Sequence, residues 1–289
     1  MEYLRSLLST PGQRQNMVDK ALGLAPDALI LDLEDGVPPS MKAAARAVVS
    51  EAIRRPAGGP ARFVRVNALE TGMQDADLRA VVHPGLAAVV LPKVERVDEI
   101  QAVDGTLARL ESERGIGRGT IRLVISIESA RGIRRADDLA EATPRTLALF
   151  IGCEDLARDL GLGVSANDDL LYARSALVFA AAAAGLLAID RVWTNFHDLD
   201  GLRRDSVRGR SLGFAGKWCI HPSQLAVVNE VFAPSADEVE HARAVVAAFE
   251  DAQAKGIGAV MLGDQFVEKP TVERAQRTLR IHAAIAARG

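Results

Sequence analysis

The chain has few cysteines, few aromatic residues and almost no excess of one charge. Its 289 residues include 2 cysteines, and aromatic residues make up 4%. Two distant cysteines form neither a disulfide framework nor a zinc motif. The 35 Lys and Arg residues nearly balance the 38 Asp and Glu residues, which leaves a net charge of −3. Without a long basic run, this composition argues against a dedicated nucleic-acid-binding protein.

Long hydrophobic runs are also missing. The longest, 177–189, has 13 residues and contains a glycine, whereas a helix that spans a membrane needs about 20 apolar residues. The N-terminal segment has an acidic residue at position 2 and Arg5 within its apolar stretch, so it is unlike a signal peptide. We therefore expect a cytoplasmic, enzyme-sized domain without a membrane span.

Short apolar runs rich in Val, Ile and Leu alternate with longer segments rich in Ala, Arg and Glu. This alternation predicts parallel strands that are covered by helices. Eight units in about 220 residues favour a closed (β/α)8 TIM barrel. A doubly wound open sheet is the alternative, but no Gly-x-Gly-x-x-Gly follows the first strand. The predicted strands are Tyr3–Ser9, Asp27–Leu33, Arg62–Val66, Leu86–Pro92, Ile121–Ile127, Leu147–Ile151, Ala188–Trp193 and Gly216–Ile220.

The end of the chain is predicted to be a helical extension of the barrel. Two helical patterns, Ser235–Lys255 and Thr271–Ala287, follow the eighth strand, and the linker 256–270 joins them. We expect residues 1–234 to form the catalytic barrel domain and 235–289 to form an appendage that is not an independent domain.

Polar residues gather where the predicted strands end, which is where the active site of a TIM barrel is assembled. Carboxylates that follow such apolar strands are costly to bury unless they are paired or bind a cation. The residues at these ends are Asp32, Glu34, Asp35, Arg65, Asn67, Lys93, Glu128, Ser129, Gly152, Glu154, Asp155 and His221.

A divalent cation held by Glu128 and Asp155 is one interpretation of these carboxylates, because Mg²⁺ prefers one or two protein carboxylates plus other oxygens. The other interpretation is that they cap the helices that follow. Arg65 suits a substrate carboxylate or an oxyanion, or it forms an ion pair with a neighbouring acid. His221, which precedes a proline, is more typical of a hydrogen-bonded turn than of an acid–base catalyst, and Cys153 is predicted to be a small apolar residue.

A series of motifs in this order resembles the citrate lyase β-subunit-like family of the wider aldolase/citrate lyase group. The resemblance extends from the first strand to the last helix. The motifs are Arg5-Ser6, Pro11-Gly12, Asp32-Leu-Glu-Asp-Gly-Val37, Val64-Arg-Val-Asn67, Leu91-Pro-Lys93, Ile127-Glu-Ser129, Gly152-Cys-Glu-Asp155 and Gly216-Lys-Trp-Cys-Ile-His-Pro-Ser-Gln224.

The resemblance implies a (β/α)8 barrel, usually a homotrimer, that binds Mg²⁺ and cleaves acyl thioesters of coenzyme A or of an acyl carrier protein. It implies that Glu128 and Asp155 are the metal ligands and that Arg65 binds substrate and stabilises its charge. Glu34 and Asp35 match an acidic catalytic pair beside the metal.

Further binding residues follow from the same resemblance. The segment from Gly152 to Glu154, together with Glu128, would line the pocket for an oxo acid. Arg14, Lys20 and Lys93 are candidates for contacts with the phosphates of coenzyme A, although each is equally well explained as a solvated charge.

The tail departs from the family pattern Gly-x-Met-Val-Asp-x-Pro. Glu268 stands where that pattern has an Asp, which reaches into the active site of a neighbouring subunit as a candidate acid–base group. The longer side chain keeps the carboxylate but shifts it, and displacements of about 1 Å can cost on the order of 100-fold in rate. Asp264 lies nearby and is a candidate to compensate.

The resemblance implies a Mg²⁺-dependent carbon–carbon lyase that splits a 3-hydroxyacyl thioester of the malyl-CoA, citramalyl-CoA or citryl type. The products would be an acetyl thioester and a 2-oxo acid. Two alternatives stay open: a malyl-CoA-type thioesterase, and a carrier-dependent or non-catalytic subunit of a lyase complex. The sequence does not identify the acyl group or its carrier.

Overall fold

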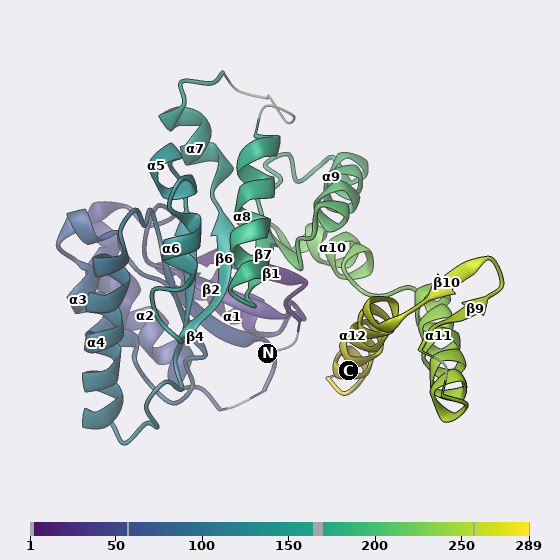
Figure 1. Ribbon diagram of the computed structural model, residues 1–289. Coiled ribbons are helices and arrows are strands. Elements are labelled where there is room, and N and C mark those ends of the chain that lie inside the picture. The colour runs from purple at the N-terminus through teal and green to yellow at the C-terminus, as the bar shows by residue number, and fades with distance from the viewer. Residues whose placement is uncertain (1–2, 57, 164–169, 257, 289) are drawn as a thin grey trace. The chain divides into compact units, whose positions relative to one another are not determined.

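The computed structural model describes residues 3–56, 58–163, 170–256 and 258–288. Within these ranges eight parallel strands close into one barrel in chain order (Figure 1), which confirms the predicted (β/α)8 fold. The strands are β1 (Ser6–Pro11), β2 (Ala28–Asp32), β3 (Ala61–Arg65), β4 (Ala88–Leu91), β5 (Arg122–Ile127), β6 (Thr146–Ile151), β7 (Leu187–Asp190) and β8 (Gly216–Cys219).

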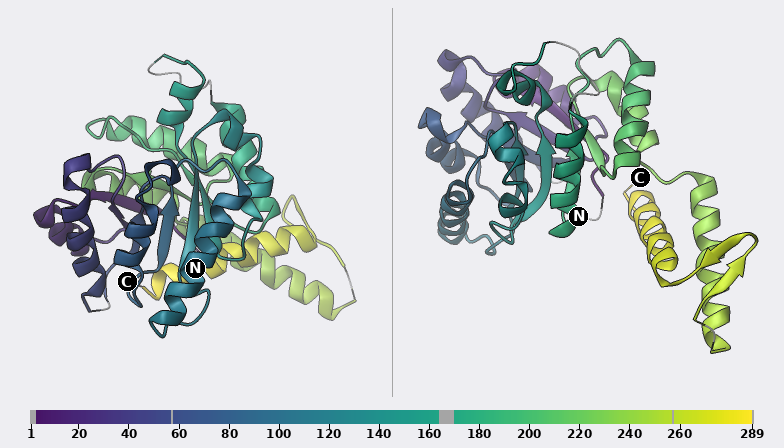
Figure 2. Two further views of the ribbon diagram at one scale, coloured as in Figure 1. Left: turned by 90° about the vertical axis from the view of Figure 1, so that its left-hand side faces the viewer. Right: turned by 45° about the horizontal axis from the view of Figure 1, so that its top comes forward.

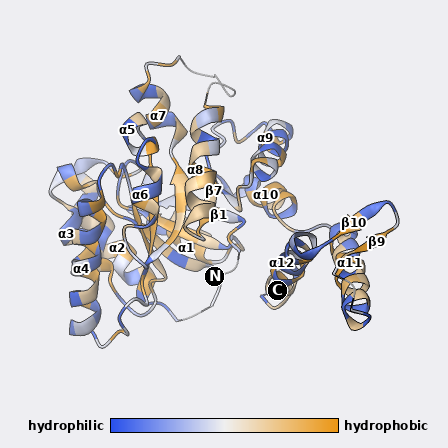
Figure 3. Ribbon diagram, viewed as in Figure 1, coloured by the Kyte–Doolittle hydropathy of each residue, from blue (hydrophilic) through white to orange (hydrophobic). Residues whose placement is uncertain are grey.

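Helices cover the outside of the barrel in the two further views as well (Figure 2). Their outward faces are hydrophilic, whereas the strands are hydrophobic (Figure 3). The helices are α1 (Gln15–Leu22), α2 (Lys42–Arg54), α3 (Gln74–Val81), α4 (Val97–Glu113), α5 (Ala130–Ile133), α6 (Ala136–Ala140), α7 (Cys153–Asp159), α8 (Leu171–Ala183), α9 (Leu199–Leu212) and α10 (Leu225–Val231). Among the described helices, none has both the length and the apolar character needed to cross a bilayer.

The predicted first strand, Tyr3–Ser9, is misplaced by three residues at its start and two at its end. The strand begins at Ser6, where pairing with β8 starts, and it continues to Pro11, which lies opposite Asp32 of β2. The apolar run that suggested the strand therefore begins before the hydrogen-bonded ladder does. Each of the other seven strands lies within its predicted segment or begins one residue before it, although β7 ends at Asp190, three residues before the predicted end at Trp193.

Every strand contributes to one apolar cluster inside the barrel. Along a strand, alternate side chains point to the same side, so a residue two positions beyond a core residue also faces the barrel interior. The cluster includes Leu7, Ile30, Phe63, Val90, Val124, Phe150, Ile189 and Trp218. This packed interior closes the barrel and forms the floor of the mouth at the carboxyl ends of the strands.

The chain divides into two compact units, and the boundary lies between Asn229 and Glu230. The barrel belongs to the unit Leu4–Asn229. The other unit contains α11 (Ala236–Ala254), β9 (Val260–Leu262), β10 (Gln265–Val267) and α12 (Lys269–Ala286). Its helices and hairpin share an apolar cluster of their own, formed by Ala242, Val245, Phe249, Val267, Val272 and Ala275.

A hairpin in the second unit occupies part of the segment 256–270, which the sequence analysis identified only as a linker. The strands β9 and β10 are antiparallel and are joined by the two residues Gly263 and Asp264. Gly263 has a φ of 58°, a conformation that glycine adopts at little cost. A glycine followed by Asp between two short apolar segments is a recognised hairpin signal, which the sequence interpretation missed.

Candidate active site

The polar residues of the barrel mouth continue the interior rows of the strands. Asp32 follows the core residue Ile30 by two positions, and Arg65 follows Phe63 in the same way. Two-residue spacing keeps these side chains on the barrel axis, one layer beyond the apolar floor. The same alternation turns Ser126, Glu128 and Gly152 toward the barrel mouth, with Glu128 one layer beyond Ser126.

Asp32 and Arg65 form the first part of the site. Strand register places them directly opposite each other. Arg65 donates through Nε and Nη2 to the two oxygens of Asp32, at 2.7 and 2.8 Å. Asp32 also accepts hydrogen bonds from the amides of Glu34 and Gly36, both at 2.9 Å. Such bidentate pairing fixes the plane of the guanidinium, which lies 5.5 Å from the ring centre of Trp218.

Glu34, Asp35 and Lys93 form the second part. The Lys93 ammonium lies 2.6 Å from Glu34 Oε1 and 3.1 Å from Asp35 Oδ1. Glu34 Oε2 lies 3.1 Å from Nη1 of Arg65 and accepts the amide of Asp35 at 3.0 Å. Burial raises the pKa of Glu34 despite the two neighbouring cations. Both oxygens of Glu34 are therefore engaged in holding the two basic side chains.

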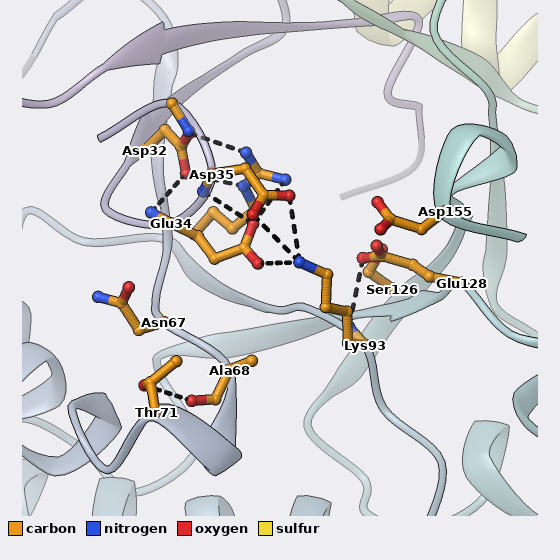
Figure 4. A network of polar contacts seen from close by, with 12 residues as sticks. Asp32, Glu34, Asp35, Asn67, Ala68, Thr71, Lys93, Ser126, Glu128 and Asp155 are labelled. Atoms are coloured by element: carbon orange, nitrogen blue, oxygen red, sulfur yellow. Dashed lines mark hydrogen bonds and ion pairs between the residues drawn. The ribbon is translucent and has the colours of Figure 1, made fainter. Parts of the chain in front are cut away.

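Glu128 lies on the opposite side of the mouth (Figure 4). Its Oε1 accepts hydrogen bonds from the Ser126 hydroxyl at 2.6 Å and from the Lys93 amide at 3.2 Å. Gly152 leaves room for this side chain, because a Cβ at that position would lie 2.5 Å from Glu128 Cγ. Real Cβ contacts are not that short, so Glu128 depends on the missing side chain.

Glu128 is a buried carboxylate that forms no ion pair within the described part of the chain, and Arg65 acts on it only at longer range. Burial raises its pKa to about 7, and the nearby negative charges of Asp155 and Glu34 add to this effect. Asp155 is half-buried and forms an ion pair with Arg158 at 2.6 Å. Figure 4 shows the carboxylates of Glu128 and Asp155 facing the same space.

The charges of the mouth suit an added divalent cation. Asp32, Glu34 and Asp35 face the cations Arg65, Lys93 and Lys42. On the other side, Glu128 and Asp155 together form one ion pair with the described residues, between Asp155 and the exposed Arg158, so the excess negative charge lies there. Among the described residues, no group of three or more His, Cys, Asp or Glu side chains is arranged to hold a metal ion. Two carboxylates nevertheless match Mg²⁺, which takes its remaining ligands from water and substrate.

The alternative, that these carboxylates stabilise the helices that follow, fits the structure in part. Ser129, and not Glu128, caps α5 by accepting the Gly132 amide. Glu154 and Asp155 lie in the first turn of α7, where a negative charge suits the helix dipole, although no side chain caps that helix. One of the two interpretations of Arg65 was an ion pair with a neighbouring acid. The structure shows such pairs with Asp32 and, through Nη1, with Glu34.

His221 and Cys153 have the structural roles that were expected of them. His221 caps the turn Pro222–Gln224 and hydrogen-bonds the Ser223 hydroxyl at 2.8 Å. Its ring stacks on Phe196, with centroids 4.7 Å apart. Cys153 is buried, and this burial raises the pKa of its thiol to about 12. A thiol in that environment is a poor nucleophile.

Four other predicted residues are exposed. Arg14 and Lys20 are exposed, immediately before α1 and in its last turn. Glu154 is exposed in the first turn of α7. Glu268 is exposed and immediately precedes α12 in the second unit. The roles assigned to these four residues stay predictions.

The sequence interpretation did not assign roles to Ser126 or Trp218, and it considered Asp32 only as one possible ion-pair partner of Arg65. Asp32 orients Arg65, Ser126 hydrogen-bonds Glu128, and Trp218 lies beneath the guanidinium. The signal that could have identified these residues is the two-residue alternation that starts at the core residues and continues to the end of each strand. It separates side chains that face the mouth from side chains that face the helices.

Comparison with known proteins identifies the family. The model of the HpcH/HpaI aldolase/citrate lyase family matches residues 5–222. The chain belongs to this family. The citrate lyase subunit beta of Leuconostoc mesenteroides subsp. cremoris is 36% identical over 96% of this chain and 92% of its own length. The (3S)-malyl-CoA thioesterase of a Cereibacter sphaeroides strain is 37% identical over 98% of this chain and 96% of its own length.

Solved structures agree with this assignment. The CitE protein of Mycobacterium tuberculosis, in complex with magnesium, acetoacetate and coenzyme A, has a TM-score of 0.77 and 31% identity. The match covers 98% of this chain and all of that one. A citrate lyase from Burkholderia xenovorans, at 21% identity, has a TM-score of 0.84 and supports the fold alone.

Proposed function

We propose that this protein is a Mg²⁺-dependent carbon–carbon lyase of the CoA-ester type. Its substrate would be a 3-hydroxyacyl thioester with a nearby carboxylate, and its products would be an acetyl thioester and a 2-oxo acid. The observation that supports the proposal is the buried Glu128 carboxylate, which forms no ion pair with a described residue and faces the same space as Asp155. Arg65 is held at the same mouth by Asp32 and Glu34.

Glu128 and Asp155 would hold the metal. When bound, Mg²⁺ supplies Lewis-acid chemistry, which lowers the pKa of a coordinated hydroxyl and stabilises developing negative charge. Glu128 is suited to this role because Ser126 and the Lys93 amide engage its Oε1 and thereby fix its orientation. The crystal structure of the Mycobacterium tuberculosis protein with magnesium and acetoacetate supports this proposal by homology.

Arg65 would bind the substrate carboxylate and stabilise negative charge on the oxygen that becomes the carbonyl of the oxo acid. Its Nε and Nη2 are engaged by Asp32. This bidentate pair makes the guanidinium rigid before substrate arrives, and rigid donors lose little free energy to reorganisation during the reaction. Glu34 and Asp35 would contribute by fixing Arg65 and Lys93.

The cleavage moves one proton and one electron pair. The hydroxyl loses its proton as the carbon–carbon bond breaks, and the electron pair of that bond passes to the thioester half as an enolate. The enolate then takes a proton at carbon. We assign this proton exchange to Glu268 of a neighbouring copy in a homotrimer, and we assign the phosphates of coenzyme A to Arg14 and Lys20.

A thioesterase is the second candidate, because the Cereibacter sphaeroides relatives named (3S)-malyl-CoA thioesterase match at 36–37% identity. In that reaction water attacks the thioester carbonyl and the thiol leaves. The relatives named citrate lyase subunit beta support a third candidate, a carrier-dependent or non-catalytic subunit of a lyase complex.

A product assay separates these activities. Purified protein with Mg²⁺ would be given malyl-CoA, citramalyl-CoA and citryl-CoA in parallel. The 2-oxo acid would be measured in one channel and the free thiol in the other. We expect oxo acid together with acetyl-CoA. Free thiol without oxo acid would identify a thioesterase, and turnover that persists unchanged with a chelator present would contradict the metal-dependent lyase.

A further inference from the structure

Lys93 has an unusual backbone conformation. Its φ is 54°, and it is the one non-glycine residue of the described chain with a positive φ. A side chain other than glycine pays a steric cost in this left-handed region, and such residues cluster at functional sites. The position directly follows Pro92 at the end of β4, so the conformation lies at the barrel mouth.

This conformation lets one residue contact both sides of the mouth. The amide of Lys93 donates to Glu128 Oε1 at 3.2 Å, on the side of β5. Its ammonium donates to Glu34 Oε1 at 2.6 Å and to Asp35 at 3.1 and 3.2 Å, on the side of β2. Figure 4 shows the side chain extending from beside Glu128 to the Glu34–Asp35 pair.

We propose that Lys93 is a positioning residue, which sets the separation between the metal-binding side of the mouth and the side that carries Arg65. Lys93 acts through two different groups. The amide orients Glu128, and the ammonium fixes Glu34, which in turn contacts Arg65 at 3.1 Å. The inference rests on the proposed function and goes beyond it, because it assigns to Lys93 a role other than contact with a phosphate of coenzyme A.

The burial of the partners supports this role. The Lys93 side chain is 29% exposed, whereas that of Glu34 is 5% exposed. A charge-assisted hydrogen bond at 2.6 Å to a buried carboxylate is short and strong. Releasing the ammonium toward a phosphate would leave Glu34 buried with one cation fewer, which is costly.

The first test compares two thioesters of the same acyl group, one carried by coenzyme A and one by pantetheine, which lacks the phosphates of the nucleotide. The Lys93→Cys variant keeps a backbone amide but has no ammonium. We expect kcat to fall about 100-fold for both thioesters, in line with a displacement of about 1 Å, while KM changes little. A rise in KM confined to the coenzyme A thioester would overturn the proposal in favour of a phosphate contact.

The second test restores the ammonium chemically. Alkylation of the Lys93→Cys variant with 2-bromoethylamine converts the new thiol into a close analogue of lysine. Cys153 and Cys219 are buried, and burial raises the pKa of both thiols to about 12, so the wild-type protein under the same treatment is a matched control. We expect alkylation to restore most of kcat. Unchanged activity after complete alkylation would contradict a role for the ammonium.

A binding measurement keeps the inference testable independently of turnover. Calorimetry would follow Mn²⁺ binding to wild type, Lys93→Cys and Lys93→Gly, and then pyruvate binding to the Mn²⁺-loaded proteins. Lys93→Gly serves as a second variant in case Lys93→Cys does not fold, since glycine adopts a φ of 54° without strain. We expect Mn²⁺ affinity to change little and pyruvate affinity to fall about tenfold, the loss typical of one hydrogen bond to a charged group.

Equal pyruvate affinity in all three proteins would overturn the inference. A wild-type protein that binds Mn²⁺ and pyruvate but cleaves no thioester would instead contradict the proposed function, so the two failures are distinguishable.

Discussion

Glu128 shows at the residue scale what the sequence could and could not predict. Its place after an apolar strand identified it as a candidate metal ligand. The sequence did not reveal that Ser126 and the Lys93 amide orient it, or that Gly152 makes room for it. These contacts join strands β4, β5 and β6, so they depend on register and on a left-handed backbone that a linear pattern does not specify.

The raised pKa of Glu128 predicts a pH-dependent stability in the metal-free protein. Its pKa rises from 4.5 to about 7 on folding, so between these values the folded protein holds a proton that the unfolded chain has lost. The contribution of Glu128 is therefore fully present below pH 4.5 and is lost as pH rises through about 7. The loss is on the order of 3 kcal/mol.

Urea denaturation from pH 5 to 8 with a chelator present measures this effect. Glu128→Gln is the matched control because an amide does not titrate. The variant should gain stability relative to wild type as pH rises, and a difference that does not vary with pH would rule out the assignment. Mg²⁺ affinity of the wild type should increase over the same range, since metal and proton compete for the carboxylate.

Gly152 predicts a steric effect on the same side chain. A Cβ at Gly152 would lie 2.5 and 2.9 Å from Cγ and Cδ of Glu128, so Gly152→Ala should displace the carboxylate. We expect catalytic activity to fall about 100-fold, as for other displacements near 1 Å, together with weaker Mg²⁺ binding by calorimetry. Gly163→Ala is the control, because nothing lies within 4 Å of a Cβ at that position. Equal Mg²⁺ affinities in the two variants would contradict this explanation.

At the scale of elements, the barrel strands were predicted and the hairpin was missed. Each barrel strand is a buried apolar run, and the segments on either side of it have helical periodicity, so two independent patterns predict it. The strands β9 and β10 have only three residues each, and one face of the hairpin packs against the apolar cluster of the second unit through Val260, Leu262 and Val267. The residues on the other face, Met261 and Phe266, are also apolar although both are 57% exposed. The sequence therefore shows no alternation of apolar and polar residues, and only the Gly263-Asp264 pair indicates the turn.

Substitution of Gly263 tests the hairpin. Its φ of 58° is costly for other residues, so Gly263→Ala should destabilise the second unit by about 1 kcal/mol. Amide hydrogen exchange should report faster exchange in β9 and β10 and unchanged exchange in the barrel strands. Gly258→Ala, in the same connection but without a positive φ, is the control. Protection that survives in the Gly263 variant would mean that the hairpin does not depend on this conformation.

At the scale of the whole molecule, closure of the barrel brings residues from distant parts of the chain to one mouth. Asp32 and Arg65 come from neighbouring strands, whereas Glu128 and Asp155 follow Arg65 by 63 and 90 residues. The sequence predicted this assembly because parallel strands in a barrel share one carboxyl end. It could not predict how the charges are distributed: Arg65 and Lys93 form ion pairs with acids on one side, while Glu128 forms none with any described residue.

The most direct test of the central claim is the Mg²⁺ dependence of oxo-acid formation in the Asp155→Ala variant. Wild type and Glu141→Gln, an exposed acidic control, would be titrated in parallel, and Mn²⁺ binding would be measured in the same samples. We predict that Asp155→Ala loses both Mg²⁺-dependent turnover and tight Mn²⁺ binding, while its fold is retained by circular dichroism. Wild-type turnover and metal affinity in this variant would contradict the assignment of Glu128 and Asp155 as the metal site.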